Sequence, residues 1–331
     1  MKKKLFCLII FFSAVLLISC SREDGSGAPS EMDRFREKNG KLKVLSTIAM
    51  INDLVKQVGG EYIDSLTLMR GDLDPHSYQL VKGDDEKLAY ADIVFYNGLG
   101  LEHGPSLQRF LETHPKSTNL GNYLIQNNPH SILRIDGQVD PHVWMDISLW
   151  AQTVPYIVEV LKSKDPVHAD TFEANGRQLV EALLQTHQEI KKQLNQIPTD
   201  KRYLVTSHDA FNYFVRAYFA TEQEIAERTW MKRFAAPEGL APESQLSASH
   251  IQQILDYLKE YRVRVIFPES NVSKDSIRKI VSAGKEKGLD IIIAPCCLYA
   301  DAMGTPGSDA DTYQKMMRHN ADWMIKYMQV D

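Results

Sequence analysis

Residues 165–198 read DPVHADTFEANGRQLVEALLQTHQEIKKQLNQIP, and the rest of the chain is organised around this stretch. Asp165 is a good helix N-cap, Pro166 suits a first helical turn, and Pro198 stops the pattern. Apolar residues recur between them at spacings of three, four or seven: Phe172, Leu179, Leu183, Ile190, Leu194 and Ile197. The stretch predicts one helix over residues 165–197, about 45 Å long. Gly176 within it predicts a bend or a close packing contact.

Strand-like and helix-like segments alternate on both sides of this helix. We predict strands at 42–46, 62–69, 91–96, 203–206, 263–267 and 290–294, with amphipathic helices at 50–58, 251–258 and 313–327. Such alternation is typical of parallel sheets covered by helices. The predicted fold is therefore α/β, with two (β/α) lobes at 42–164 and 198–331 joined by one long rigid helix.

The first twenty residues have the features of a bacterial lipoprotein signal. A basic start, Lys2-Lys3-Lys4, precedes an apolar run that ends in the lipobox-like Leu17-Ile18-Ser19-Cys20. The run is shorter than the roughly 20 residues that span a bilayer. We predict that residues 1–19 are removed and that a lipidated Cys20 anchors the protein to a membrane outside the cytoplasm. The polar residues 20–41 would then form a flexible tether.

Charge and cysteine content exclude some classes of protein. Removal of residues 1–19 takes away three lysines and no acids, so the formal net charge changes from −5 to −8. No basic stretch remains that would bind nucleic acid. Cys296 and Cys297 are adjacent, so with Cys20 lipidated no long-range disulfide is available. We interpret the pair as two small buried residues at a strand end, while a thiolate close to a metal site stays open as an alternative.

The tripeptide Asp-Pro-His occurs twice, at residues 74–76 and 140–142. Proline fixes φ near −65° and removes a backbone donor, so His76 and His142 are each expected on a stiffened loop. Two solvent-facing turns would be the simplest interpretation of such loops. Because the tripeptide is repeated, and the first copy follows a predicted strand, we favour a metal site or an acid/base site.

Three strands of the second half each end just before a side chain that can bind a metal. His208 follows the strand at 203–206, Glu269 follows 263–267, and Asp301 follows 290–294. The candidate site combines His76, His142 and His208 with either Asp301 or Glu269. Such a set suits Zn²⁺, Mn²⁺ or Fe²⁺ and is too rich in nitrogen for Ca²⁺ or Mg²⁺. We interpret the other histidines as structural or solvated: His103, His114, His130, His168, His187, His250 and His319.

Five motifs resemble those of the metal-binding lipoproteins of bacterial ABC importers for zinc, manganese and iron. They lie at 74–78, 97–102, 140–146, 207–211 and 298–304, in the family's order and behind a lipobox. The resemblance implies one metal ion buried between two lobes and delivered by a monomeric protein to the transmembrane subunit of an ABC permease. It also implies His76, His142, His208 and Asp301 as ligands, with Glu269 next to the site.

The resemblance leaves the metal undecided. Zinc-dedicated members usually carry a long loop rich in histidine and acids, whereas residues 113–139 contain only His114 and His130 as histidines. Manganese-dedicated members often supply a glutamate where this chain has His208. A nitrogen donor favours metals later in the Irving–Williams order, so manganese, zinc and iron all stay open.

A zinc hydrolase and a surface adhesin are the two alternatives to a metal carrier. A zinc hydrolase with the same residues would keep one coordination position open for water, whereas four protein ligands close the shell. The sequence also lacks a His-Glu-x-x-His helix and a Gly-x-Ser-x-Gly elbow. A surface adhesin is compatible with a lipid anchor, but no residue specifies one. We therefore expect a metal carrier and not an enzyme.

Overall fold

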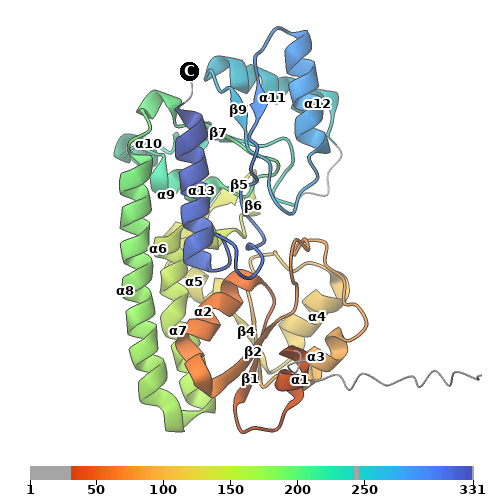
Figure 1. The fold of residues 1–331 in the computed structure, drawn as a ribbon, viewed down its shortest axis with the longest axis vertical. Coiled ribbons are helices and arrows are strands. Elements are labelled where there is room, and N and C mark those ends of the chain that lie inside the picture. The colour runs from red at the N-terminus through yellow and green to blue at the C-terminus, as the bar shows by residue number, and fades with distance from the viewer. Residues whose placement is uncertain (1–30, 242–245, 330–331) are drawn as a thin grey trace, which may run out of the picture.

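Two lobes stand one above the other along a single long helix in the computed structural model (Figure 1). The structure describes residues 31–241 and 246–329. The predicted signal peptide, Cys20 and the first part of the tether lie outside the described residues. Within residues 31–241 and 246–329, no helix combines the length and the apolar character needed to cross a membrane.

The first lobe is built on a parallel four-stranded sheet with the strand order β2-β1-β3-β4. Its strands are β1 (Leu42–Ser46), β2 (Ile63–Thr67), β3 (Ile93–Tyr96) and β4 (Ser117–Asn119). Helices α2 (Ala49–Gly59), α3 (Asp84–Tyr90), α4 (Pro105–Thr113) and α5 (Leu120–Asn127) alternate with them. All four residues of β3 are buried, because helices cover both faces of such a sheet. The predicted parallel α/β fold is confirmed.

The second lobe contains two parallel strand pairs, β7–β8 and β9–β10. Its strands are β7 (Leu204–Val205), β8 (Phe234–Ala235), β9 (Val265–Ile266) and β10 (Ile292–Ile293). Its helices are α9 (Asn212–Tyr218), α10 (Glu222–Glu227), α11 (Ala248–Glu260) and α12 (Asp275–Glu286). The amide of Phe267 donates to the carbonyl of Val205 at 2.9 Å and so joins the pairs. The strands predicted here exist but are shorter, and β8 was not predicted.

Helix α8 (Ala169–Leu194) is the predicted connecting helix and extends along both lobes (Figure 1). It is shorter than the predicted 165–197 at both ends, because residues 166–168 form a separate 3₁₀ turn that is capped by Asp165 and the helix already ends at Leu194. Helix α13 (Tyr313–Met328) packs against α8. The amide of Tyr313, at the start of α13, donates to Asp53 Oδ2 of α2 at 3.1 Å. The last helix of the chain therefore returns to the first lobe.

The tether prediction was wrong for residues 31–36. These residues form helix α1 (Glu31–Arg36), which packs against β2. Phe35 is the reason, since its side chain is only 1% exposed and joins the hydrophobic core. A single buried aromatic ring can hold a short polar helix that has no apolar periodicity of its own.

The remaining elements connect the first lobe to α8. They are the hairpin strands β5 (Arg134–Ile135) and β6 (Gln138–Val139), the short helix α6 (Ile147–Trp150) and helix α7 (Val154–Lys164). Helices α7 and α8 pack closely at Gly176, where an added Cβ would lie 2.4 Å from Cγ2 of Val158. Of the two roles predicted for Gly176, the structure shows the close contact.

We expect Gly176→Val to destabilise the protein by about 1–3 kcal/mol, because the new side chain forces α7 and α8 apart. The free energy of unfolding in urea measures the loss. Gln178→Val is the matched control, since it places the same side chain at an exposed position of the same helix. Equal stability of the two variants would contradict the packing argument.

Candidate metal centre

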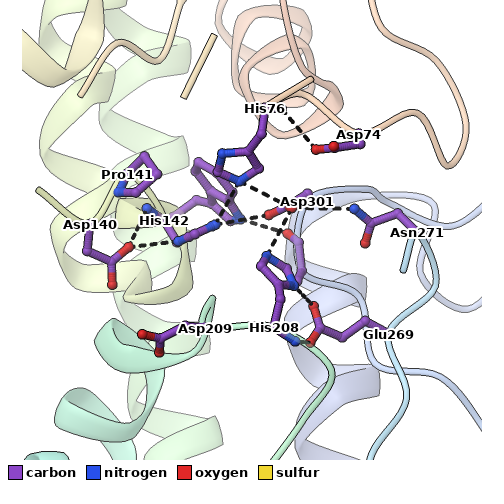
Figure 2. Close-up of polar contacts among 12 residues, drawn as sticks. Asp74, His76, Asp140, Pro141, His142, His208, Asp209, Glu269, Asn271 and Asp301 are labelled. Atoms are coloured by element: carbon purple, nitrogen blue, oxygen red, sulfur yellow. Dashed lines mark hydrogen bonds and ion pairs between the residues drawn. The ribbon is translucent and has the colours of Figure 1, made fainter. Parts of the chain in front are cut away.

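Four side chains from separate loops converge on one buried point between the lobes (Figure 2). His76 follows β2, His142 follows β6, His208 follows β7 and Asp301 follows β10. None of the four is more than 3% exposed. One potential ligand atom of each lies within 4.8 Å of the others. The structure thus brings together the four residues that the resemblance implied as ligands.

The carboxylate of Asp301 lies among three imidazole rings. Its Oδ2 is 3.2 Å from Nε2 of His208 and 3.6 Å from Nε2 of His76. Its Oδ1 is 3.4 Å from Nε2 of His142, and the Nε2 atoms of His76 and His142 are 3.3 Å apart. All three Nε2 atoms therefore face the same small volume, which is the arrangement that a single cation requires.

The aspartate of each Asp-Pro-His tripeptide holds the histidine that follows it. Asp74 Oδ1 accepts from the backbone N–H of His76 at 2.9 Å, and Asp140 Oδ1 accepts from that of His142 at 2.9 Å. Asp140 Oδ1 also lies 2.7 Å from Nδ1 of His142. These two aspartates were not predicted as functional residues. The signal was present in the tripeptide, because aspartate commonly accepts from the backbone two residues later.

Glu269 lies behind His208 and outside the cluster of four. Its Oε2 is 2.5 Å from Nδ1 of His208, and its Oε1 accepts from the backbone N–H groups of Ser207 and His208 at 2.9 and 2.8 Å. A carboxylate at Nδ1 keeps the proton on that nitrogen and leaves the lone pair of Nε2 for a metal. Of the two carboxylates considered from the sequence, Asp301 is the one that faces the centre.

The charges of the centre follow from its burial and its pairing. Burial lowers the pKa of His76 to about 3, so this ring is neutral. Burial alone would lower the pKa of His208, but Glu269 and Asp301 outweigh it and raise that pKa well above its usual value. Burial likewise would raise the pKa of Asp301, but His208 and His142 hold it well below the usual range. In the absence of metal, His208 is protonated and Asp301 is ionised.

Trp144 links the loop that carries His142 to the loop that carries Asp301. Its indole N–H donates to the carbonyl of Ala300 at 2.8 Å, and its own carbonyl accepts from the hydroxyl of Tyr313 at 2.5 Å. The ring lies edge to face against His142, with 5.4 Å between the ring centroids. The loop that carries His142 is therefore bonded directly to the loop that carries Asp301.

We expect Trp144→Phe to cost about 1–3 kcal/mol of stability, because the buried carbonyl of Ala300 loses its donor. The free energy of unfolding of the metal-free protein measures this loss. Trp323→Phe, at a partly exposed position of α13, controls for the change of ring. A Trp144→Phe variant as stable as the Trp323→Phe control would show that the bond does not hold the loops together.

The interpretation of Cys296 and Cys297 as buried residues was wrong. Both are partly exposed free thiols, and Sγ of Cys296 lies 3.4 Å from Nε2 of His319. The ring of His319 reaches them from α13, which sequence adjacency does not reveal. Neither cysteine belongs to the cluster of four side chains described above.

One histidine outside the cluster lies close to it. The ring of His103 is 5.8 Å from that of His76, measured between the ring centroids.

Most of this chain, including the four clustered side chains, matches one family of metal-binding proteins. The family model of the zinc-uptake complex component A, periplasmic, matches residues 44–326, which include all four clustered side chains. The metal-binding protein YtgA of Chlamydia pneumoniae is 41% identical over 286 residues, 86% of this chain and 85% of its own length. The manganese-binding lipoprotein MntA of Bacillus subtilis is 32% identical over 320 residues, 96% of each chain.

A solved structure agrees with these sequence comparisons. The crystal structure of Fe(III)-bound YtgA from Chlamydia trachomatis superposes with a TM-score of 0.81 at 35% identity. It covers 86% of this chain and 97% of that one. The similarity therefore includes both lobes and the helix that joins them.

Proposed function

The chain belongs to the family of the zinc-uptake complex component A, periplasmic, and from this premise we propose that it binds a transition-metal ion outside the cytoplasm and delivers it to a membrane ABC permease. One observation carries the proposal. His76, His142, His208 and Asp301 come from both lobes, and their potential ligand atoms lie within 4.8 Å of one another at a buried point. The metal is the cargo of the protein.

The donor set restricts the metal to a small group. Three imidazole nitrogens and one carboxylate suit borderline first-row cations. A buried cation also needs charge compensation, which Asp301 supplies directly and Glu269 supplies through His208. The relative MntA is named for manganese and the family for zinc, and the solved structure of YtgA is bound to Fe(III). We propose that this chain binds one divalent ion, Mn²⁺, Zn²⁺ or Fe²⁺, although the iron in the YtgA structure is Fe(III).

Binding of the metal would crosslink the two lobes. We propose the division made from the sequence, with lobes at 42–164 and 198–331 and the connection at 165–197. His76 and His142 then belong to the first lobe, while His208 and Asp301 belong to the second. Because α8 and α13 both pack along the lobes, wide opening of a hinge would break contacts that a small loop movement leaves intact.

The position of the protein in the cell follows from its first residues. We propose that residues 1–19 are removed and that lipidated Cys20 holds the protein at the outer face of a membrane, next to its permease. The relative MntA is named a lipoprotein. Several acyl chains on one residue anchor a protein stably, whereas a single chain does so only marginally. We propose that the protein acts as a monomer, that it binds no nucleic acid, and that it is a carrier and not an adhesin.

We propose that the centre has no catalytic role. A zinc hydrolase would need an open coordination position and a path for its substrate. Here four side chains that are at most 3% exposed surround the point. A buried site closed by protein ligands suits capture and release of an ion.

Metal analysis tests the proposed function. The soluble chain from residue 21 onward is refolded from chelator and dialysed against equal Mn²⁺, Fe²⁺ and Zn²⁺ without oxygen. We expect about one equivalent of metal, as for a single four-ligand site, and its loss in His142→Ala. Metal that is absent from the wild type, or retained in the variant, would refute the site.

A further inference from the structure

A second group of reactive side chains lies outside the metal centre, where the segment that follows β10 contacts α13. Sγ of Cys296 is 3.4 Å from Nε2 of His319, and Nδ1 of His319 is 2.9 Å from Oδ2 of Asp309. Nε2 of His319 also lies 3.1 Å from the carbonyl of Cys297. Thiol, imidazole and carboxylate thus stand in line, which is the order of nucleophile, base and orienting group in nucleophilic sites.

Exposure and packing fit a reactive group at this place. His319 is only 7% exposed, whereas both cysteines are partly exposed and the side chain of Asp309 is 74% exposed. The ring of Tyr299 lies edge to face against His319, with 5.0 Å between the centroids. The base is therefore held in place next to two partly exposed cysteines.

We propose that Cys296 is a thiol–disulfide exchange site for small-molecule disulfides, with His319 as its base, Asp309 as a positioning residue and Cys297 as the second thiol. With the proton of His319 on Nδ1 and directed at Asp309, the lone pair of Nε2 accepts the proton of the Cys296 thiol. Sγ then attacks one sulfur of the disulfide R–S–S–R. The S–S bond breaks, a mixed disulfide forms on Cys296, and the departing R–S⁻ takes the proton back from the imidazolium.

Cys297 completes the exchange. The thiol of Cys297 loses its proton as its sulfur attacks Sγ of Cys296. The bond from Sγ to the R–S group breaks, the departing R–S⁻ takes up that proton as the second R–SH, and a bond closes between the two cysteines. The small disulfide is reduced to two thiols while the cysteine pair is oxidised, so atoms and electrons balance. Adjacent Cα atoms are about 3.8 Å apart, below the usual range for disulfides. The closed ring is therefore strained and easily reduced, and the exchange is reversible.

The surroundings of Cys296 explain why a base is needed. Burial raises the pKa of the Cys296 thiol, and the neighbouring Cys297 and Asp309 act in the same direction. The thiol is therefore protonated at rest, and its proton has to leave during the attack. The imidazolium that forms donates from Nδ1 to Asp309 and from Nε2 to the carbonyl of Cys297. Both acceptors are already in position to stabilise it.

Two single-thiol proteins test the proposal in the chain from residue 21 onward, which lacks Cys7 and Cys20, after treatment with chelator. Cys297→Ser leaves Cys296, and Cys296→Ser leaves Cys297. Each is reacted with cystine, and peptide mass spectrometry follows the adduct on the remaining thiol. We expect His319→Gln to slow the reaction of Cys296 about 100-fold, as loss of a general base does, and to change that of Cys297 less than about twofold. Equal rates with and without His319, or equal slowing of both thiols, would overturn the proposal.

Asp309 provides a second test that does not disturb the core. In the Cys297→Ser protein, we expect Asp309→Ala to slow the reaction of Cys296 with cystine. We expect Asp309→Asn to keep most of the rate, because its amide oxygen can still accept from Nδ1 of His319. If both variants react as fast as the Cys297→Ser protein that carries Asp309, Asp309 does not position the base.

The role of Cys297 is tested in the chain that keeps both cysteines. There we expect the cysteinyl adduct on Cys296 to be replaced by a disulfide between Cys296 and Cys297, with release of a second cysteine. A stable adduct there would refute the role of Cys297.

Discussion

Asp301→Ala is expected to lower the metal affinity roughly 100- to 5,000-fold, which corresponds to about 3–5 kcal/mol for removing one partner of a buried charge pair. Asp301 is the one carboxylate whose oxygens face all three Nε2 atoms of the cluster. Without it, the cation would be surrounded by imidazoles alone in a site with little access to water. Titration in competition with a chelator of known affinity measures the loss.

Two further variants separate the roles of Asp301. Asp301→Asn keeps an oxygen donor and removes the charge, so its affinity should fall between those of the wild type and Asp301→Ala. Asp209→Asn is the matched control, because Asp209 follows His208 directly but bonds to Nδ2 of Asn212 at 2.8 Å. We expect Asp209→Asn to bind within about threefold of the wild type, because one altered hydrogen bond outside the cluster has a small effect. Asp301→Ala with unchanged affinity and an unchanged metal-induced thermal shift would refute Asp301 as a ligand.

Acidification from about pH 7 to about pH 5 is expected to weaken metal binding about 100-fold, or tenfold per pH unit for each displaced proton. The pKa of His208 lies well above its usual value, so this ring carries a proton in the metal-free protein at neutral pH. A metal needs the lone pair of Nε2 and must displace that proton. Lower pH favours the protonated, metal-free form, whereas His76, with a pKa of about 3, stays neutral over this range.

Calorimetry in two buffers with different enthalpies of ionisation measures the proton directly, and we expect about one proton released per metal bound. Glu269→Gln is the informative variant, because the charge of Glu269 raises the pKa of His208 more than the charge of Asp301 does. Its loss should reduce the number of protons released near neutral pH. Equal affinity at pH 5 and pH 7.5 would rule out coupling between protons and metal.

The parts of the fold that the sequence predicted are those with a strong local pattern. The apolar repeat of residues 172–197 predicted α8, and the buried run of β3 predicted a strand of a parallel sheet. Strand β8 has two residues and β4 has three polar residues. Neither was predicted, because neither lies in an apolar run as long as those that mark the other strands. Their pairing is decided by neighbours far away in the chain.

The candidate site was predicted to a similar extent. His76 and His142 are marked by the proline that stiffens each loop, and the structure brings them together. The choice between Asp301 and Glu269 was not available from their positions, because each follows a strand. It depends on where each side chain points: Glu269 reaches Nδ1 of His208, and Asp301 reaches Nε2. The spacing of residues in the sequence does not show which nitrogen of His208 a carboxylate will face.

The contact between Tyr313 and Asp53 has a consequence for how the protein is made. These residues are 260 positions apart, and α13 covers α2 as well as α8. The first lobe therefore cannot complete its own surface until almost the entire chain has been synthesised. Contacts of such long range form late in folding. For a polypeptide that crosses a membrane unfolded, this architecture delays closure of the first lobe until the last helix arrives.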